Sequence, residues 1–508
     1  PHPRASPAVP SCSIFLGMSS RPSPPSRPVR WGSALSGLLV LATACTRSPD
    51  VDARMPVLWA NALYGVMRVE RLSPPVASRL SAYAMTALYA GIAAAHPALM
   101  PLDGALVALP VLPRADDPQS VDATLVAVTT ERVVLDALLR DALPTTTAQI
   151  ARLADSLVGA RVRDGVSVTV QAQSDTLGRR IGALLVAWAN ADGFAGTRGR
   201  AYVAPTGEGQ WVNDAPANIY ATQNLSGVSE FVALDNPANV QRGTNMSDRG
   251  LIMSRPKAAG ARTMPAANMA GATEPYWNEL RPFVLEMWNA CPVPEPVAYA
   301  RDSTSAMYRE AQTVLDTARA RTAEQRTIAL YWADNAGESG TPVGHWLSIA
   351  AQMIGERTLD ADQAVRLLLA TSLAQADAFI AAWGYKYQYL QLRPRSYIRR
   401  HLDPAWEPLI PTPPFPEYPA GHSTQSAAAA AALTVLIGSA PFSDSTSMSI
   451  GHAVRSFASF QAASEEAGRS RVYAGVHFPS GNVGGLALGR CIGGRVGMIF
   501  TRPWMGVR

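Results

Sequence analysis

Three short segments in the second half of the chain carry the side chains best suited to binding an anion. Each combines a cation or an imidazole with a glycine or proline that would begin or end a helix. The segments are KYQYLQLRP at 386–394, PFPEYPAGHSTQSAAAAAAL at 414–433 and GRSRVYAGVHFPSGNVGG at 468–485. Lysine and arginine hydrogen-bond oxyanions, and a helix N-terminus adds unpaired N–H groups and a positive dipole. If the segments meet in space, they predict a site for one small oxyanion.

The first segment places Lys386 and Arg393 seven residues apart. At ~100° per residue, a continuous helix would put both side chains on nearly the same face, about 10 Å apart along the axis. Pro394 predicts the end of that helix. A solvated basic face is the alternative interpretation. The chain has only two lysines, Lys257 and Lys386, against 42 arginines, which favours a specific role for this one.

The second segment places Gly421 and His422 at the predicted start of an alanine-rich helix. A glycine there lets the backbone approach a ligand closely, and the helix start favours an anion. Taken alone, His422 is equally well explained as a neutral cap or core residue.

The third segment adds another cation, Arg471, and a second histidine, His477. Gly475 and Pro479 interrupt the helical pattern, so we expect His477 to lie on a loop. Ser480 is the predicted N-cap of the last helix.

Apolar residues recur at helical spacing through most of the chain, and alternating strand patterns are scarce. The expected fold class is all-α, with packed helical bundles and the anion site inside the C-terminal bundle. Helices are expected near residues 74–96, 117–142, 145–160, 170–191, 303–320, 323–335, 344–355, 360–390, 421–437, 450–468 and 481–499.

Four regions are expected along the chain. Residues 1–50 read as a leader and linker, 51–202 as an N-terminal helical region, and 276–508 as the bundle that carries the site. Residues 203–275 are rich in Asn, Ala, Gly and Pro, and they have no sustained period. A loop of this length inside a domain is uncommon, so it either covers a site or connects the two halves.

The leader has the composition of a targeting segment. It carries four arginines and no acid before residue 45, and without them the net charge of +5 falls to +1, which gives no support for a nucleic-acid partner. The apolar run WGSALSGLLVLATA is too short to span a bilayer and has the proportions of a signal peptide. LATAC, ending at Cys45, resembles a bacterial lipoprotein cleavage site. The chain is therefore expected to be exported, to the periplasm or cell surface, with a lipid anchor or an ordinary cleaved signal as alternatives.

Four cysteines are present, and no Cys/His spacing suggests zinc. Cys12 and Cys45 lie in or beside the leader. Cys291 and Cys491 would remain in the mature protein, where an oxidising compartment would allow them to pair.

Together the three segments resemble the signature of the phosphatidic acid phosphatase type 2/vanadium-dependent haloperoxidase superfamily. That signature reads K-x6-R-P, then P-S-G-H, then S-R-x5-H. The corresponding residues here are Lys386, Arg393, Pro394, Pro419, Ala420, Gly421, His422, Ser470, Arg471 and His477. The flanking TPVGHW, PPFPEYP and GVHFPS are similar to the exported bacterial haloperoxidase-related branch. The resemblance extends over residues 60–500 and is weakest in 203–275.

The resemblance implies an all-α fold with vanadate, or phosphate, bound inside a helical bundle. Lys386, Arg393 and Arg471 would bind the oxygens of the anion, and the Gly421 N–H would donate a further hydrogen bond.

Three residues would be catalytic by the same resemblance. His422 would be the general acid/base, and Lys386 would polarise the peroxide. His477 would be the ligand of the vanadium, or the nucleophile if the substrate is a phosphoester.

The sequence departs from the family pattern at two positions. Ala420 replaces a serine whose hydroxyl would bond the anion, and Gly481 stands where an aspartate usually orients the imidazole. A missing orienting carboxylate would harm a nucleophilic histidine most. The departures allow for weak activity, and they predict that Gly481→Asp strengthens turnover if His477 is poorly oriented.

The leading interpretation is a vanadate-dependent haloperoxidase that uses hydrogen peroxide, a halide and an organic acceptor. Vanadium would act as a Lewis acid, so no redox-active side chain is required. The alternatives are an acid phosphatase that forms a phosphohistidine from a phosphoester, and a surface-exposed binding lipoprotein with a degenerate site.

Overall fold

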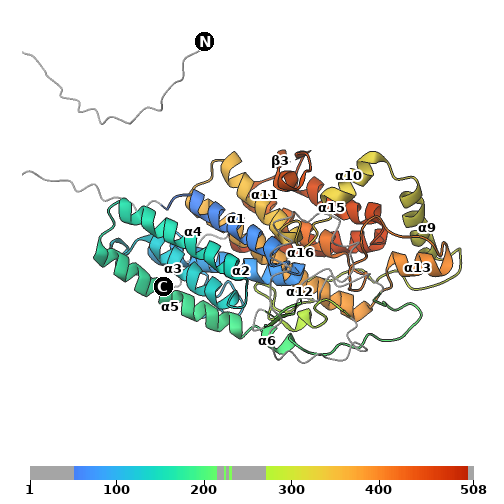
Figure 1. Ribbon diagram of the computed structural model, residues 1–508, viewed down its shortest axis with the longest axis horizontal. Coiled ribbons are helices and arrows are strands. Elements are labelled where there is room, and N and C mark those ends of the chain that lie inside the picture. The colour runs from blue at the N-terminus through green and yellow to red at the C-terminus, as the bar shows by residue number, and fades with distance from the viewer. Residues whose placement is uncertain (1–50, 214–221, 225–227, 231–270, 502–508) are drawn as a thin grey trace, which may run out of the picture. The chain divides into compact units, whose positions relative to one another are not determined.

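Two long apolar helices, α2 (Pro74–Ala95) and α12 (Ala361–Tyr389), pack against each other in the core of the computed structural model (Figure 1). The structure describes residues 51–213, 222–224, 228–230 and 271–501. Every residue of α2 is buried. Among the described residues, only α12 is long and apolar enough to cross a membrane, but 94% of its apolar window is buried inside the protein. Its composition is therefore that of a central core helix.

The first half of the chain adds helices around α2, and side-chain caps define their starts. Ser73, Asp122 and Ser167 each accept a backbone N–H in the first turn of α2, α3 and α5. The helices are α1 (Arg54–Val69), η1 (Pro118–Ser120), α3 (Ala123–Leu138), α4 (Pro144–Arg163), α5 (Val168–Asn190) and α6 (Phe194–Thr197).

The second half forms the bundle around α12. Thr322 and Asp360 make capping boxes at the starts of α10 and α12. The elements are η2 (Trp277–Glu279), α9 (Ala306–Arg319), α10 (Ala323–Tyr331), α11 (Thr341–Glu356), α13 (Pro394–His401), α14 (Gly421–Ile437), η3 (Thr446–Ile450), α15 (Phe460–Ala474) and α16 (Pro479–Ile499). Among the described residues, strands form two antiparallel ribbons, β1 (Thr222–Asn224) with β2 (Val228–Glu230) and β3 (Phe442–Asp444) with β4 (Arg455–Phe457).

Helices α14 and α16 approach each other closely because both present small residues. A Cβ atom on Gly489 would lie 2.1 Å from the Thr424 carbonyl oxygen, and one on Gly493 would lie 2.0 Å from the Ala428 carbonyl oxygen. Glycine at these positions therefore sets the distance between the two helices. This matters for the site, because α14 begins at Gly421 and α16 follows the loop that carries His477.

The all-α class is confirmed, and most expected helices are present within a few residues of their expected ends. The helix expected near 450–468 is wrong: β4 occupies part of that range, and α15 starts at Phe460 because the Ser459 side chain caps it. The expected N-cap at Ser480 is also wrong, since Phe478 is the N-cap of α16 and Pro479 takes the first helical position.

The described residues from 51 to 501 belong to one compact unit, and a continuous apolar cluster runs through it from Met55 to Phe500. The division into an N-terminal region at 51–202 and a C-terminal bundle at 276–508 stays a prediction. The leader expected in residues 1–50, including Cys12 and Cys45, lies outside the described residues, as does most of the predicted loop at 203–275.

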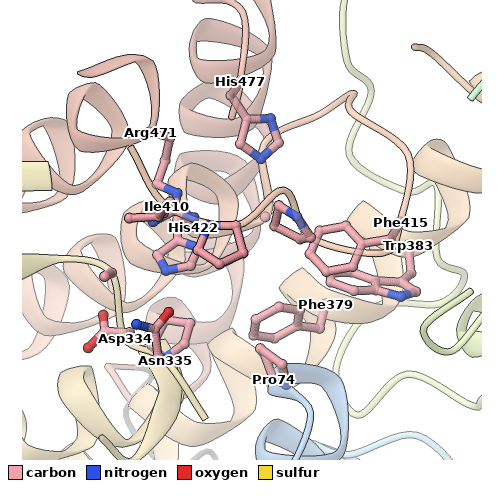
Figure 2. Close-up of a pocket in the computed structure, with 15 residues that line it drawn as sticks. Pro74, Asp334, Asn335, Phe379, Trp383, Ile410, Phe415, His422, Arg471 and His477 are labelled. Atoms are coloured by element: carbon pink, nitrogen blue, oxygen red, sulfur yellow. The ribbon is translucent and has the colours of Figure 1, made fainter. Parts of the chain in front are cut away.

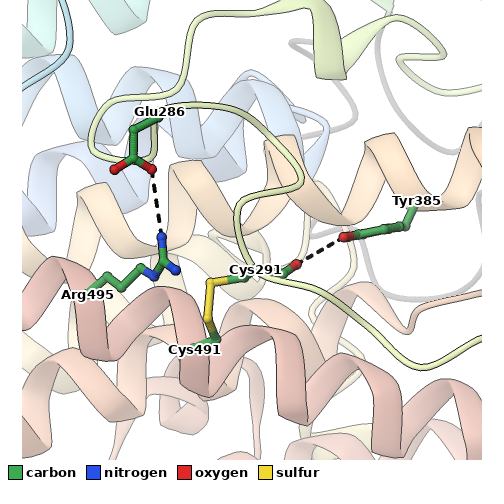
Figure 3. The surroundings of a disulfide bond; sticks show 5 residues. All are labelled: Glu286, Cys291, Tyr385, Cys491 and Arg495. Atoms are coloured by element: carbon green, nitrogen blue, oxygen red, sulfur yellow. Dashed lines mark hydrogen bonds and ion pairs between the residues drawn. A yellow bond between two sulfur atoms is a disulfide. The ribbon is translucent and has the colours of Figure 1, made fainter.

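Cys291 and Cys491 form a disulfide that ties the segment before α9 to α16 (Figure 3). The Tyr385 hydroxyl of α12 donates a hydrogen bond to the Cys291 carbonyl at 3.0 Å. Glu286 and Arg495 form an ion pair beside the bond at 3.7 Å. The pairing that the sequence left open is therefore present, and it joins parts of the chain 200 residues apart.

Candidate active site

The first two predicted cations meet, but not through the geometry expected from their spacing. Helix α12 ends at Tyr389 because Leu390 adopts a left-handed conformation with φ of 52°. Arg393 is the N-cap of α13, and Pro394 begins that helix rather than ending the previous one. The prediction that Lys386 and Arg393 share one helix face is therefore wrong.

Both cations are instead directed at the same piece of chain, residues 415–417. Lys386 Nζ donates to the carbonyl oxygens of Pro416 and Glu417, both at 2.9 Å. Arg393 Nε donates to the Phe415 carbonyl at 2.8 Å. Both side chains are fully buried. The segment that leads into α14 is thus held against the break between α12 and α13.

A pocket brings the second and third segments together (Figure 2). Gly421, His422, Arg471 and His477 line one part of it, and Figure 2 shows the rings of Phe379, Trp383 and Phe415 across from the two histidines. The remaining lining residues are Pro74, Ala333, Asp334, Asn335, Pro342, Ile410, Pro411 and Pro413.

Lys386 and Arg393 do not line this pocket, yet they lie close to it. A Cβ atom built on Gly421 would be 3.9 Å from Lys386 Cε. Arg393 Nη1 lies 3.0 Å from His477 Nε2. The six predicted groups therefore converge on one place, although their roles stay predictions.

The hydrogen bonds of His477 define its tautomer. A guanidinium can only donate, so Nε2 must accept from Arg393 Nη1 and carry the lone pair. The proton then sits on Nδ1, which lies 2.8 Å from Glu417 Oε1 and donates to it. Burial, followed by the charges of Arg393, Lys386 and Arg471, holds the pKa of His477 well below its ordinary value. His477 is thus a neutral imidazole with its lone pair on the nitrogen that faces Arg393.

Glu417 is the main residue in contact with the predicted site that the sequence analysis missed. Its carboxylate is fully buried and also accepts the Phe478 N–H at 2.9 Å. Burial raises the pKa of Glu417 to about 7, against the lowering effect of Lys386 and Arg393. Glu417 stands in the PPFPEYP stretch that was quoted only for its resemblance. No local signal marked it, because its contact with His477 spans 60 residues.

The expectation that Gly481 leaves His477 without an orienting carboxylate is wrong. A Cβ atom on residue 481 would lie 2.3 Å from Glu417 Oε1 and 2.7 Å from Oε2. The Glu417 carboxylate occupies the space that a side chain at 481 would need. Gly481→Asp is therefore expected to disrupt this packing rather than to strengthen turnover.

His422 presents a buried nitrogen to the pocket. Its Nε2 atom has no hydrogen-bond partner within the described part of the chain. Burial, then the charges of Arg471 and His345, keep the pKa of His422 well below its ordinary value, and a hydrogen bond with the Ala333 backbone offsets this only in part. His422 is therefore a neutral imidazole that can accept a proton.

A third histidine, His345, is buried between two carboxylates, one of which, Asp334, lines the pocket. Its Nδ1 is 2.9 Å from Asp334 Oδ1 and its Nε2 is 2.7 Å from Asp444 Oδ2. Its ring stacks on Trp332 with centroids 4.5 Å apart. Burial alone would lower the pKa of His345, but the two carboxylates raise it to about 10. The resulting imidazolium offsets the charge of Asp334, a lining residue that would otherwise repel an anion.

The donor set fits a small multivalent oxyanion. The buried region around His477 holds three basic side chains and one acidic side chain. The basic ones are Lys386, Arg393 and Arg471, and the acidic one is Glu417, which contacts His477. Burial and the charge of Arg393 lower the pKa of Lys386 well below its ordinary value, and a bound anion would counter that effect. The neutral Nε2 of His477 supplies a ligand atom. Ala420 contributes no side-chain donor, and its N–H is already bonded to the Gly481 carbonyl at 2.9 Å.

The fold is all-α, and the residues predicted to bind an oxyanion lie together in a helical bundle. The family model for the VCPO second helical-bundle domain matches residues 366–506, which include all three segments. Comparison with curated protein sequences gives no significant match.

Solved structures give the remaining similarities. The chain is 27% identical to the first bacterial vanadium-dependent iodoperoxidase, with a TM-score of 0.70, covering 88% of this chain and 96% of that one. Holo-type and apo-type bacterial vanadium-dependent chloroperoxidases share the fold, at 15% and 14% identity and TM-scores of 0.57 and 0.58. They cover 85% and 89% of this chain, and 93% and 98% of their own chains. The chain is therefore similar to bacterial vanadium haloperoxidases over most of its length, and residues 366–506 match the second helical-bundle domain of that group.

Proposed function

We propose that this protein is a vanadate-dependent haloperoxidase, which oxidises a halide with hydrogen peroxide. The arrangement around His477 carries the proposal. This imidazole is neutral, and its Nε2 lone pair faces Arg393. Lys386, Arg471 and His422 lie close enough to lower the pKa of His477. The likeness to the iodoperoxidase structure over most of both chains supports it.

Vanadate bound here would supply a Lewis-acid centre that activates peroxide without a redox-active side chain. His477 Nε2 would be its protein ligand, and Arg393, Arg471 and the Gly421 N–H would hold its oxygens. Lys386 uses two of its three N–H donors on backbone carbonyls, which leaves one for the anion or the peroxide.

His422 is suited to take a proton from the incoming peroxide. It is neutral, its Nε2 lies buried in the pocket without a protein partner, and Arg471 is close enough to influence its charge. The rings of Phe379, Trp383 and Phe415 line the other part of the pocket, and apolar walls of this kind strengthen electrostatic interactions inside a site.

The test is a pair of assays on the purified protein. We expect hydrogen peroxide to oxidise iodide or bromide in a reaction that requires added vanadate and halogenates an organic acceptor. Hydrolysis of nitrophenyl phosphate without vanadate, together with no halide oxidation, would contradict the proposal.

A phosphatase is the second candidate, and Glu417 favours it specifically. A histidine nucleophile needs a carboxylate on its second nitrogen, and Glu417 Oε1 lies 2.8 Å from His477 Nδ1. In that reaction His477 would form the phosphohistidine and His422 would protonate the leaving group. The same assay pair distinguishes the two candidates. The convergence of the six groups argues against a degenerate binding protein.

We also propose that the protein is exported, to the periplasm or the cell surface. The disulfide between Cys291 and Cys491 supports this, because such bonds persist in oxidising compartments. A lipid anchor at Cys45 remains one form of this proposal. Mass spectrometry of the protein from membrane and soluble fractions would test it, and a reduced protein in the cytoplasm would contradict it.

A further inference from the structure

We propose that Glu417 is the positioning residue of His477, and that its carboxylate has taken the place of one at position 481. The inference rests on the proposed oxyanion site, since it concerns how the ligand nitrogen of His477 is presented. The carboxylate that orients His477 would then come from the segment before α14, and not from the first turn of α16.

The first argument is the direction of the hydrogen bonds. Glu417 Oε1 accepts the Nδ1 proton of His477 at 2.8 Å, while Arg393 Nη1 donates to Nε2 at 3.0 Å. Both contacts specify the same tautomer. The ring is therefore fixed at both nitrogens. A bound anion would take the Nε2 lone pair in place of Arg393 Nη1, whose N–H would then donate to the oxygens of the anion.

The second argument is that Glu417 and a side chain at 481 exclude each other. The Cβ position of residue 481 falls 2.3 Å from Glu417 Oε1 and 2.8 Å from Glu417 Cδ. Real atoms do not approach so closely, so a glycine at 481 is the condition for Glu417 to reach His477. The two unusual features of the site, a glycine at 481 and a buried glutamate at 417, thus explain each other.

The third argument is that Glu417 connects the three segments of the site. Its carbonyl accepts from Lys386 Nζ, and its carboxylate accepts from His477 and from the Phe478 N–H. Its own N–H donates to the Gln391 carbonyl at 3.0 Å. Glu417 therefore sets the position of His477 relative to Lys386. One anion can contact both side chains only if this relative position is fixed.

The test moves the carboxylate from one position to the other. Four proteins are compared: the wild type, Glu417→Ala, Glu417→Ala combined with Gly481→Asp, and Glu417→Ala combined with Gly481→Asn. The asparagine variant is the matched control, because it has the shape of aspartate without its charge. Removal of Glu417 creates the room that residue 481 lacks in the wild type.

Two measurements are made on each protein besides halide oxidation. Calorimetry gives the affinity for orthovanadate, and inorganic phosphate serves as a second probe. NMR of histidine ¹⁵N-labelled protein without any anion reports the Nδ1–H of His477, which Glu417 should protect from exchange with water. Thermal unfolding shows whether each variant is folded.

We expect Glu417→Ala to lose the protected Nδ1–H signal and to bind vanadate about 10- to 100-fold more weakly, as is typical when an outer partner of a ligand is removed. Gly481→Asp should restore both in that background, whereas Gly481→Asn, whose amide oxygen is a weaker acceptor than a carboxylate, should restore them only in part. An unchanged affinity in folded Glu417→Ala, or equal rescue by asparagine and aspartate, would overturn the inference.

Two further outcomes are kept distinct. If Glu417→Ala does not fold, Glu417→Leu takes its place, since leucine fills most of the volume and cannot accept the Nδ1 proton. Vanadate affinity equal to that of the wild type would then overturn the inference. If the wild type binds no vanadate, the proposed function fails, while the Nδ1–H signal still decides whether Glu417 positions His477.

Discussion

At the scale of single residues, the site depends on groups held in their neutral or charged forms by burial and by close neighbours. His477 and His422 are neutral chiefly because they are buried, and nearby cations lower the pKa of each further. His345 is charged because it lies between two carboxylates. Two of these three histidines are therefore neutral and one is protonated. Only the two neutral histidines line the pocket.

Ala420→Ser is expected to strengthen vanadate binding. The serine hydroxyl would add one donor beside the Gly421 N–H, and a single hydrogen bond is worth about 1 kcal/mol, or roughly 2- to 10-fold in affinity. Calorimetry with vanadate measures the effect. A rise in melting temperature without a change in affinity would mean that serine acts only as a helix cap at this N-cap position.

At the scale of elements, the site is held by contacts between helix ends rather than within one helix. Helix α12 stops before Arg393 because the chain turns at Leu390, where the Leu390 carbonyl accepts the Trp211 N–H at 2.6 Å and Gln391 pairs with Gln210. Helices α14 and α16 then place His422 and the loop of His477 at a fixed separation.

Gly493→Ala is expected to destabilise the fold and to weaken anion binding together. Its Cβ would meet the backbone of Ala428 at 2.0 Å, so α14 and α16 must separate, which typically costs about 1–3 kcal/mol. Gly494→Ala is the matched control in the same helix, because a Cβ there meets nothing within 4 Å. Urea unfolding and vanadate titration of both variants provide the measurement. Equal effects of the two substitutions would contradict the account of the helix contact.

His345→Gln is expected to lose stability in a way that depends on pH. The pKa of His345 is raised in the folded protein to about 10, from about 6.5 in the unfolded chain. The stabilisation is therefore complete below about pH 6.5 and is lost as the pH rises through 10. Near pH 6 the variant should unfold with about 3–5 kcal/mol less free energy, and the difference should shrink towards pH 10. A difference that stays constant from pH 6 to pH 10 would contradict this.

Part of the site could be predicted from sequence because local signals marked it. The start of α14 at Gly421 and the loop position of His477 follow from prolines and glycines in the chain. The turn at Leu390 carries no such residue and is held by residues from distant segments, so helical periodicity extended the helix too far. The contact of Glu417 with His477 depends on a glycine 64 residues away and could be recognised only in three dimensions.

At the scale of the whole molecule, one core joins the helices around α2 to the bundle that carries the site. The disulfide closes a loop of 200 residues around this core and fastens α16, the helix that follows His477.

Replacement of both Cys291 and Cys491 by serine is expected to lower the free energy of unfolding by about 2–4 kcal/mol. The fold should persist, because Cys291 is only one member of an apolar cluster that extends from Met55 to Phe500. Denaturant unfolding of the variant and of the reduced wild type measures the effect. Identical unfolding of reduced and oxidised wild type would show that the bond does not form or does not constrain the chain.

The central claim is that one lysine, two arginines and two histidines surround a single oxyanion held at His477. Calorimetric titration of orthovanadate into the wild type and into His477→Ala tests it most directly. The account predicts one bound vanadate per chain in the wild type and an affinity loss of more than about 100-fold in the variant, larger than the loss typical of an outer-shell partner. No binding by the wild type, or equal affinity in the variant, would contradict it.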